Sequence, residues 1–206
     1  HKEMIARGTY DEETAEADLA SVNIAECLGD DGFSLMPAVF ISVHRKIFTG
    51  VLRHAGEIRK CDITKKEKVL RGDTVDYAPA SDLLPALLYD FGRERKFSYK
   101  GLTAGEAIAH LAEFISGIWQ IHPFMEGNTR TTAVFAVMYL RHLGFAVHSE
   151  AFAESSKYFR NALVRANCAN PRKGVKSDMS FLFLFLRSLM LGESHELRSS
   201  DLRIPA

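Results

Sequence analysis

Apolar residues recur three and four positions apart along most of the sequence, and this spacing limits the chain to a fold built mainly from helices. Residues 37–52 and 81–92 each show one such stripe, and a third stripe consists of Ile108, Leu111, Ile115 and Ile118. One stretch, residues 68–78, instead resembles two short strands, because Val69 and Leu70 precede the turn Arg71–Asp73 and Thr74, Val75 and Tyr77 follow it. We therefore predict a mainly α fold, a helical bundle with one short β-hairpin.

Start and stop signals divide this pattern into segments. Thr103 and Glu106 have the spacing of a capping box, Pro123 disfavours helical geometry at His122, and Gly144 suits a helix end. With about 150 residues per domain, 206 residues favour one core. We expect an N-terminal helix in 1–32, one domain over 33–192 and a loosely held polar tail over 193–206. The predicted helices cover residues 11–28, 37–52, 81–92, 103–122, 129–143, 155–166 and 179–191.

Charge and cysteine usage exclude several classes of protein. The 26 basic and 26 acidic residues cancel, which speaks against a nucleic-acid partner. The apolar run Phe181–Leu186 is far shorter than the roughly 20 residues that cross a bilayer, so no membrane partner is expected. Cys27, Cys61 and Cys168 are far apart and form no Cys-x-x-Cys pair, so we expect reduced, mostly buried thiols and a cytoplasmic location.

The segment between two predicted helices has the residues of a phosphate-binding loop. Gly127 and Asn128 can form a turn whose N–H groups converge, and the next helix adds unpaired donors. Arg130 would lie in the first turn of that helix, where a cation is unfavourable unless an anion binds nearby. Glu126 can share Mg²⁺ with phosphate oxygens, and the imidazole of His122 suits a general base.

The string His122-Pro123-Phe124-Met125-Glu126-Gly127-Asn128-Thr129-Arg130 resembles the signature of the Fic family, His-Pro-Phe-x-Asp/Glu-Gly-Asn-Gly/Lys-Arg, and departs from it at Thr129. Upstream, His44, Phe48 and residues 55–59 are similar to a second recurrent Fic segment, and the predicted hairpin stands where the family has its flap. The resemblance implies a protein adenylyltransferase. Its substrates would be ATP and a target protein bearing a Ser, Thr or Tyr hydroxyl, with Mg²⁺ as cofactor.

The resemblance also implies a role for each matching residue. His122 would deprotonate the target hydroxyl, and Glu126 would bind Mg²⁺. Phosphates would bind at Gly127, Asn128 and the backbone of Thr129, while Arg130 would hold the leaving β and γ end. Phe124 would anchor the loop in the core. The flap would align the target backbone as an added strand, through Val69, Leu70, Thr74, Val75 and Tyr77.

Three departures from the family pattern keep alternatives open. The β-branched Thr129 adds bulk where phosphate should approach the backbone, and Ala133 occupies the place of a second Arg found in some members. The sequence Ser21–Glu26 is close to the inhibitory helix of many members, but Ala25 occupies the Glu position, so we expect weak self-inhibition or none. Alternatives are another phosphate transfer, AMP removal, or a degenerate nucleotide-binding module. An antitoxin-like inhibitor or a second copy of the chain remains open as a partner.

Two further features have structural interpretations. We interpret His44 as a helix-packing or capping residue rather than a catalytic one. A locally basic stretch is interpreted as a solvated face in preference to a target-docking surface; it comprises Arg53, Arg59, Lys60, Lys65, Lys66 and Lys68.

Overall fold

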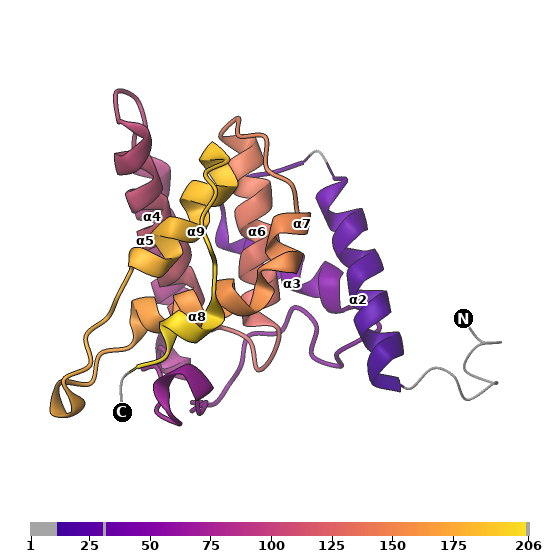
Figure 1. Cartoon of the computed structure of the whole chain (residues 1–206). Helices are drawn as coiled ribbons and strands as arrows, with labels where there is room; N and C mark the ends of the chain where they lie inside the picture. Colours follow the sequence, from indigo (N-terminus) through magenta and orange to yellow (C-terminus); the bar gives the residue numbers. More distant parts are fainter. Residues whose placement is uncertain (1–11, 31, 205–206) are drawn as a thin grey trace.

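The computed structural model describes residues 12–30 and 32–204, and helices joined by loops make up most of this part (Figure 1). The predicted start of the first helix at Asp11 and the end of the tail lie outside these residues. The prediction of a mainly α fold is confirmed. The α-helices are α2 Glu12–Leu28, α3 Pro37–Phe48, α4 Leu83–Lys96, α5 Ala104–Ile121, α6 Asn128–His142, α7 Glu150–Glu154, α8 Ser156–Asn167 and α9 Ser180–Leu191. Short 3₁₀ turns are η1 Lys68–Leu70, η2 Ala80–Asp82, η3 Pro171–Lys173 and η4 Ser199–Leu202.

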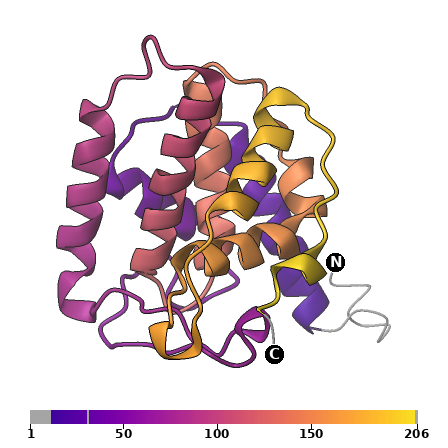
Figure 2. The ribbon, with the colours of Figure 1, turned by 60° about the vertical axis from the view of Figure 1, so that its left-hand side comes forward.

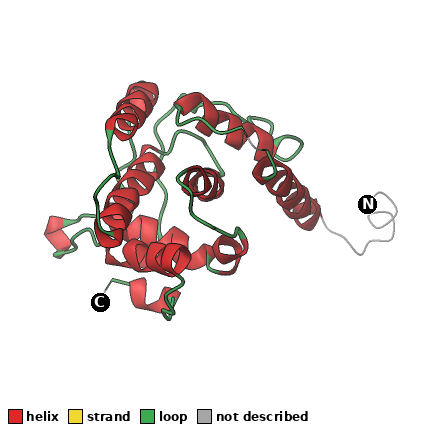
Figure 3. Ribbon diagram, turned by 90° about the horizontal axis from the view of Figure 1, so that it is seen from above, coloured by secondary structure: helices red, strands yellow, loops and turns green. Residues whose placement is uncertain are grey.

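Helices α5 and α6 form the middle of the molecule. The α5 helix packs against α4, α6, α8 and α9, while α6 also contacts α2 and α3. Figure 2 shows α4 and α5 side by side, and Figure 3 shows α6 end-on among the other helices. Both helices are buried along much of their length because they are enclosed in this way. None of the described helices is long and apolar enough to cross a membrane.

Most helix ends follow their sequence signals. The capping box of Thr103 and Glu106 is present, and α5 ends at Ile121, directly before His122. The α3 helix ends at Phe48, before the predicted Leu52, because the chain turns at Gly50 with φ +79°. The α4 helix continues through Gly92 to Lys96, since an internal glycine costs only about 1 kcal/mol.

The predicted β-hairpin over 68–78 is wrong in its secondary structure. In the described residues, Glu67 and Asp73 form one isolated bridge around η1, and no ladder extends from it. Val69, Leu70 and Val75 are buried in the main core. A short apolar run around a turn does not distinguish a strand from a buried coil, and here burial in the core determined the conformation.

The tail is also more ordered than predicted. Leu202 is fully buried and Ile204 is nearly so. The backbone N–H of Ile204 donates to the Val69 carbonyl at 3.1 Å, and Arg71 Nε donates to the Ile204 carbonyl at 3.1 Å. Two apolar residues in a polar segment are enough to hold it against the core.

Candidate active site

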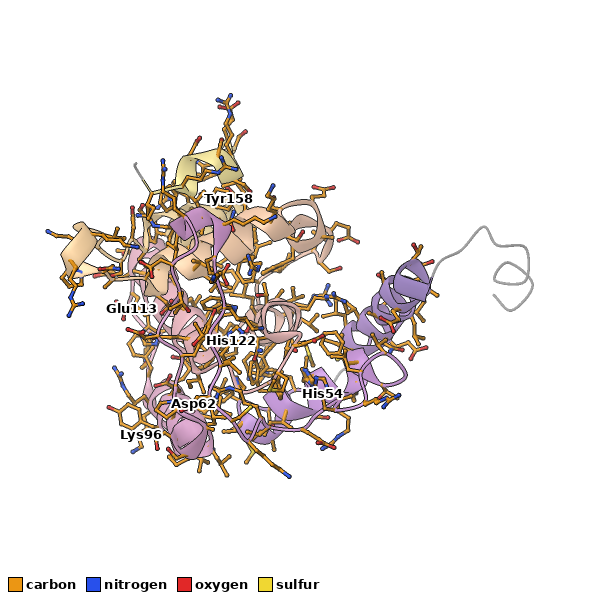
Figure 4. The ribbon with its side chains drawn as sticks, turned by 90° about the horizontal axis from the view of Figure 1, so that it is seen from below. His54, Asp62, Lys96, Glu113, His122 and Tyr158 are labelled. Atoms are coloured by element: carbon orange, nitrogen blue, oxygen red, sulfur yellow. The ribbon has the colours of Figure 1, made fainter. Side chains whose placement is uncertain are left out.

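His122 lies at the joint between α5 and the loop that leads into α6. Its backbone is left-handed, with φ +52°, a conformation that is uncommon for a residue with a side chain. Its N–H donates to the Trp119 carbonyl at 3.1 Å, and its carbonyl accepts from Arg59 Nε at 2.8 Å. These two hydrogen bonds hold the strained backbone. Figure 4 labels His122 in the interior of the molecule, between the surrounding helices.

The imidazole of His122 has one engaged nitrogen and one bare nitrogen. Nδ1 lies 3.2 Å from the Trp119 carbonyl, and only a protonated Nδ1 can donate to a carbonyl oxygen. In the neutral ring the lone pair is therefore on Nε2. That nitrogen is buried and has no hydrogen-bond partner among the described residues. The tautomer is the one that a general base requires.

Two aromatic rings cover this imidazole. The Tyr77 ring lies 4.1 Å from it, and the Trp119 ring meets it edge-on at 5.2 Å. Burial lowers the pKa of His122 to about 3, and the charge of Lys65 and, more weakly, those of Arg59 and Arg160 act in the same direction. The ring is therefore neutral at pH 7, in an environment that favours anions.

The loop after His122 is fastened to α3. Phe124 is fully buried, and its ring stacks on His44 with centroids 3.8 Å apart. His44 Nδ1 accepts from the Gly56 N–H at 2.8 Å, so Nε2 carries the proton and donates to the Glu126 carbonyl at 3.1 Å. Burial lowers the pKa of His44 to about 4. Both ring nitrogens are engaged, in agreement with a packing role for His44.

Gly127 and Asn128 form the turn into α6. Gly127 has φ +76°, and a Cβ atom there would clash with the Phe48 ring, so the position requires glycine. Asn128 is buried, and its side chain accepts from the Phe124 N–H at 3.0 Å and donates to the Phe124 carbonyl at 2.7 Å. Its amide therefore closes the loop, which leaves its backbone N–H for a ligand at the α6 N-terminus.

Thr129 and Arg130 begin α6 on the other side of that turn. The Thr129 hydroxyl accepts from Trp119 Nε1 at 3.0 Å, so the residue that departs from the Fic signature satisfies a buried indole. Arg130 is exposed and stacks over the Phe48 ring at 5.4 Å. It has no carboxylate partner in residues 12–30 and 32–204.

A cavity of about 690 Å³ opens beside this turn, between α2, α6 and the segment of α7 and α8. Gly127, Thr129, Arg130 and Ala133 line it, whereas His122 and Glu126 lie outside its wall. Its other lining residues include Ala17, Ser21, Ile24 and Leu28 of α2, Phe152 and Phe159 of the α7–α8 segment, and Lys65. The structure therefore gathers part of the predicted phosphate site around one cavity.

The flap residues meet the site mainly through Tyr77. Thr74 and Tyr77 are half-buried, while Val69, Leu70 and Val75 belong to the core. Gln120 Nε2 donates to the Asp76 carbonyl at 3.1 Å, which fixes this segment beside the end of α5. A target could pair with the backbone here, but not with the three buried side chains.

Arg59 was wrongly interpreted as part of a solvated face. It is 4 % exposed, and besides the His122 carbonyl it donates to the carbonyls of Cys61 and Ala78. The local sequence did not indicate that Arg59 is buried, because the carbonyls of Ala78 and His122 that it binds are distant in sequence. Trp119 was not identified as a site residue from the sequence, although its place one helical turn before His122 would have indicated a contact with that histidine.

Cys27 and Cys168 are buried as expected, Cys61 is exposed, and all three are free thiols.

Comparison with known proteins identifies the same segment. The family model described as Fic/DOC family matches residues 34–140. A curated relative, the protein adenylyltransferase VbhT of Bartonella schoenbuchensis, is 28% identical over 105 residues, which is 51% of this chain and 21% of the relative. The matched segment of this chain thus spans about a fifth of that protein's length.

Solved structures extend the similarity to most of the chain. The N-terminal Fic domain of a Bartonella effector protein from Bartonella sp. AR 15-3 has a TM-score of 0.67 at 14% identity, covering 86% of this chain and 80% of that one. BepC from Bartonella tribocorum, solved with bound AMPPNP, has a TM-score of 0.65 at 14% identity, covering 88% and 89%. At these identities the likeness concerns the fold.

Proposed function

Because the chain belongs to the Fic/DOC family, we propose that it is a protein adenylyltransferase that transfers AMP from ATP to a Ser, Thr or Tyr hydroxyl of a target protein. The observation that carries this proposal is the bare Nε2 of His122, held in a neutral ring next to the loop that enters α6. The curated relative with the same printed activity supports it.

The chemistry needs one proton acceptor and one site for negative charge. The target hydroxyl oxygen would attack the α-phosphorus of ATP while His122 Nε2 takes the hydroxyl proton. A new P–O bond forms, the bond from the α-phosphorus to the bridging oxygen breaks, and pyrophosphate leaves. The lowered pKa makes the covered imidazole a poor base, and displacement of Tyr77 together with the charge of bound phosphates would raise it toward neutrality.

The α6 N-terminus and its arginine would hold the phosphates. Backbone N–H groups from Gly127 to Thr129 have no helical partners of their own, and the helix dipole favours an anion there. Arg130 would bind the leaving end, since its guanidinium is exposed without a carboxylate partner in the described residues.

The loop also fits a Mg²⁺ ligand. Glu126 is exposed, and His44 fixes its backbone carbonyl, so its carboxylate is a free hard oxygen donor. Mg²⁺ commonly binds one or two carboxylates together with substrate phosphates, so a single acidic side chain suffices. When bound, Mg²⁺ would neutralise charge on the phosphates.

The direct test uses ATP labelled at either the α- or the γ-phosphate, incubated with the protein and candidate targets. Label retained on protein from the α position only is expected. Label from the γ position only would instead identify a kinase-type transfer, and label from neither would leave AMP removal or binding without turnover.

Two variants test the assigned roles. His122→Ala should abolish α-label transfer without unfolding the chain, and persistent labelling would refute the base. Arg130→Ala should weaken ATP binding in calorimetry, whereas unchanged affinity would refute its phosphate role.

A further inference from the structure

The cavity beside the loop carries an excess of positive charge that the family signature does not account for. Its described lining contains four cationic residues and no acidic one: Lys65, Arg130, Lys157 and Arg160. The whole chain, by contrast, has no net charge. The remaining wall is largely apolar, with Ile24, Val134, Val137, Phe152 and Phe159 among its residues. An anionic ligand with an apolar part fits this lining.

Arg160 reaches this cavity from α8 and is only partly neutralised. Its guanidinium forms an ion pair with Glu67 at 2.8 Å, and the Glu67 carboxylate is almost fully buried. The Arg160 side chain itself remains 45 % exposed. A guanidinium has five N–H donors, so one carboxylate leaves several for a second anion. Glu67 thus positions Arg160 without closing it to a ligand.

Lys65 reaches the same cavity from the segment before η1. Its ammonium donates to the Met125 carbonyl at 3.2 Å, which uses one of its three donors. Burial lowers the pKa of Lys65, and the charge of Glu126 counteracts this. A half-buried ammonium with free donors, next to the phosphate loop, is stabilised by a bound anion.

We propose that Arg160 and Lys65 bind phosphate oxygens of the nucleotide and supply the cationic contact that Ala133 lacks. This inference rests on the proposed function for the identity of the nucleotide. Ala133 and Arg160 line the same cavity, so a charge lost from α6 is replaced by one on α8.

The test compares binding of ATP and of adenosine to the full chain by calorimetry. Arg160→Ala and Lys65→Ala should each weaken ATP binding about tenfold or more, the effect of one charge-assisted hydrogen bond. Adenosine affinity should not change, because it has no phosphate. Lys66→Ala removes an exposed neighbouring cation outside the cavity wall and should leave ATP affinity unchanged.

A second variant separates loss of a phosphate contact from loss of folding. Arg160→Ala leaves the buried Glu67 unpaired, so Arg160→Ala combined with Glu67→Gln removes the charge of both partners. This double variant should fold and still lose ATP affinity. Wild-type ATP affinity in it, or an equal loss for adenosine, would overturn the inference.

The two proposals fail in different ways. AMP transfer by the wild type with unaltered ATP affinity in the Arg160 and Lys65 variants would overturn only the cation roles. Loss of ATP affinity in these variants, with no α-label transfer by the wild type, would support the cation roles and refute the adenylyltransferase.

Discussion

His44 and His122 are both buried neutral imidazoles, and they differ in what their second nitrogen meets. In His44 the second nitrogen is bonded, so the ring serves as a link between α3, Gly56 and the loop. In His122 it faces no partner in the described chain, which is costly for a structural residue and useful for a base. The sequence identified both residues, but only the contacts separate their roles.

Burial of His44 predicts a pH effect on stability. Its folded-state pKa is about 4, below the usual 6.5, so the unfolded chain binds a proton first as pH falls. Stability is therefore full above about pH 6.5 and declines toward pH 4. His44→Gln should reduce this decline by on the order of 1–2 kcal/mol between pH 7 and 5, measured by urea unfolding.

The exposed His148 gives a matched control for that experiment. His148→Gln should leave the pH dependence of unfolding as in the wild type. If the free energy of unfolding depended on pH in the same way in the wild type and in His44→Gln, this result would contradict the burial of His44 as a neutral imidazole.

The Thr129 hydroxyl should determine the polarity around the indole of Trp119, the chain's one tryptophan. Thr129→Val keeps the shape but removes the acceptor of the indole N–H, at a cost of about 1–3 kcal/mol. Thermal unfolding should show the loss, and the tryptophan emission should shift to shorter wavelength. Thr129→Ser keeps a hydroxyl and should retain the wild-type emission; identical spectra for Val and Ser would refute the bond.

The α2 helix forms one wall of the cavity without a carboxylate. Ala17, Ser21, Ile24 and Leu28 recur at helical spacing along that wall, and Asn23 Nδ2 fastens the helix to the Ile47 carbonyl at 3.0 Å. The helix thus occupies a place from which it could block the nucleotide, but neither Ala25 nor Glu26 lines the cavity. This position was not derivable from the sequence of α2, because it depends on packing against α3 and α6.

Ala25→Glu should introduce inhibition from this helix. The new carboxylate would lie one helical turn after Ser21, which lines the cavity together with Arg130. An ion pair between it and Arg130 would compete with phosphate. We expect AMP transfer to fall about fivefold, equivalent to about 1 kcal/mol for a partly exposed pair. The rate of α-label incorporation measures this, with Glu26→Ala as the control, and an unchanged rate would dismiss α2 as an inhibitory element.

Across the whole molecule, local patterns were predictable and distant contacts were not. Spacing and end signals predicted the helices other than the short α7, the capping box of α5, and the loop 122–130 as a candidate site. The burial of Arg59, the Arg160–Glu67 pair and the docking of the tail each join residues far apart in sequence. No local pattern encodes such contacts, and the predicted hairpin and loose tail failed for that reason.

The packed tail predicts a measurable stability contribution. Leu202→Ala should destabilise the chain by about 2–4 kcal/mol, because Leu202 is fully buried and its removal leaves a cavity. Urea unfolding gives the difference. The exposed Glu196 offers a control, since Glu196→Ala should change stability by less than about 0.5 kcal/mol. Equal stability of Leu202→Ala and wild type would mean that the tail is detached in solution.

The phenol ring over His122 has a consequence for idle turnover. Water is by far the most abundant source of hydroxyl groups around any protein. A solvent-accessible imidazole beside bound ATP could take a proton from water as well as from the hydroxyl of a target protein. In the structure Nε2 is buried, and the Tyr77 ring lies 4.1 Å from the imidazole. Under the proposed function, the reaction would start only when a target protein displaces the Tyr77 ring. Hydrolysis of ATP by water would therefore be suppressed in the absence of a target.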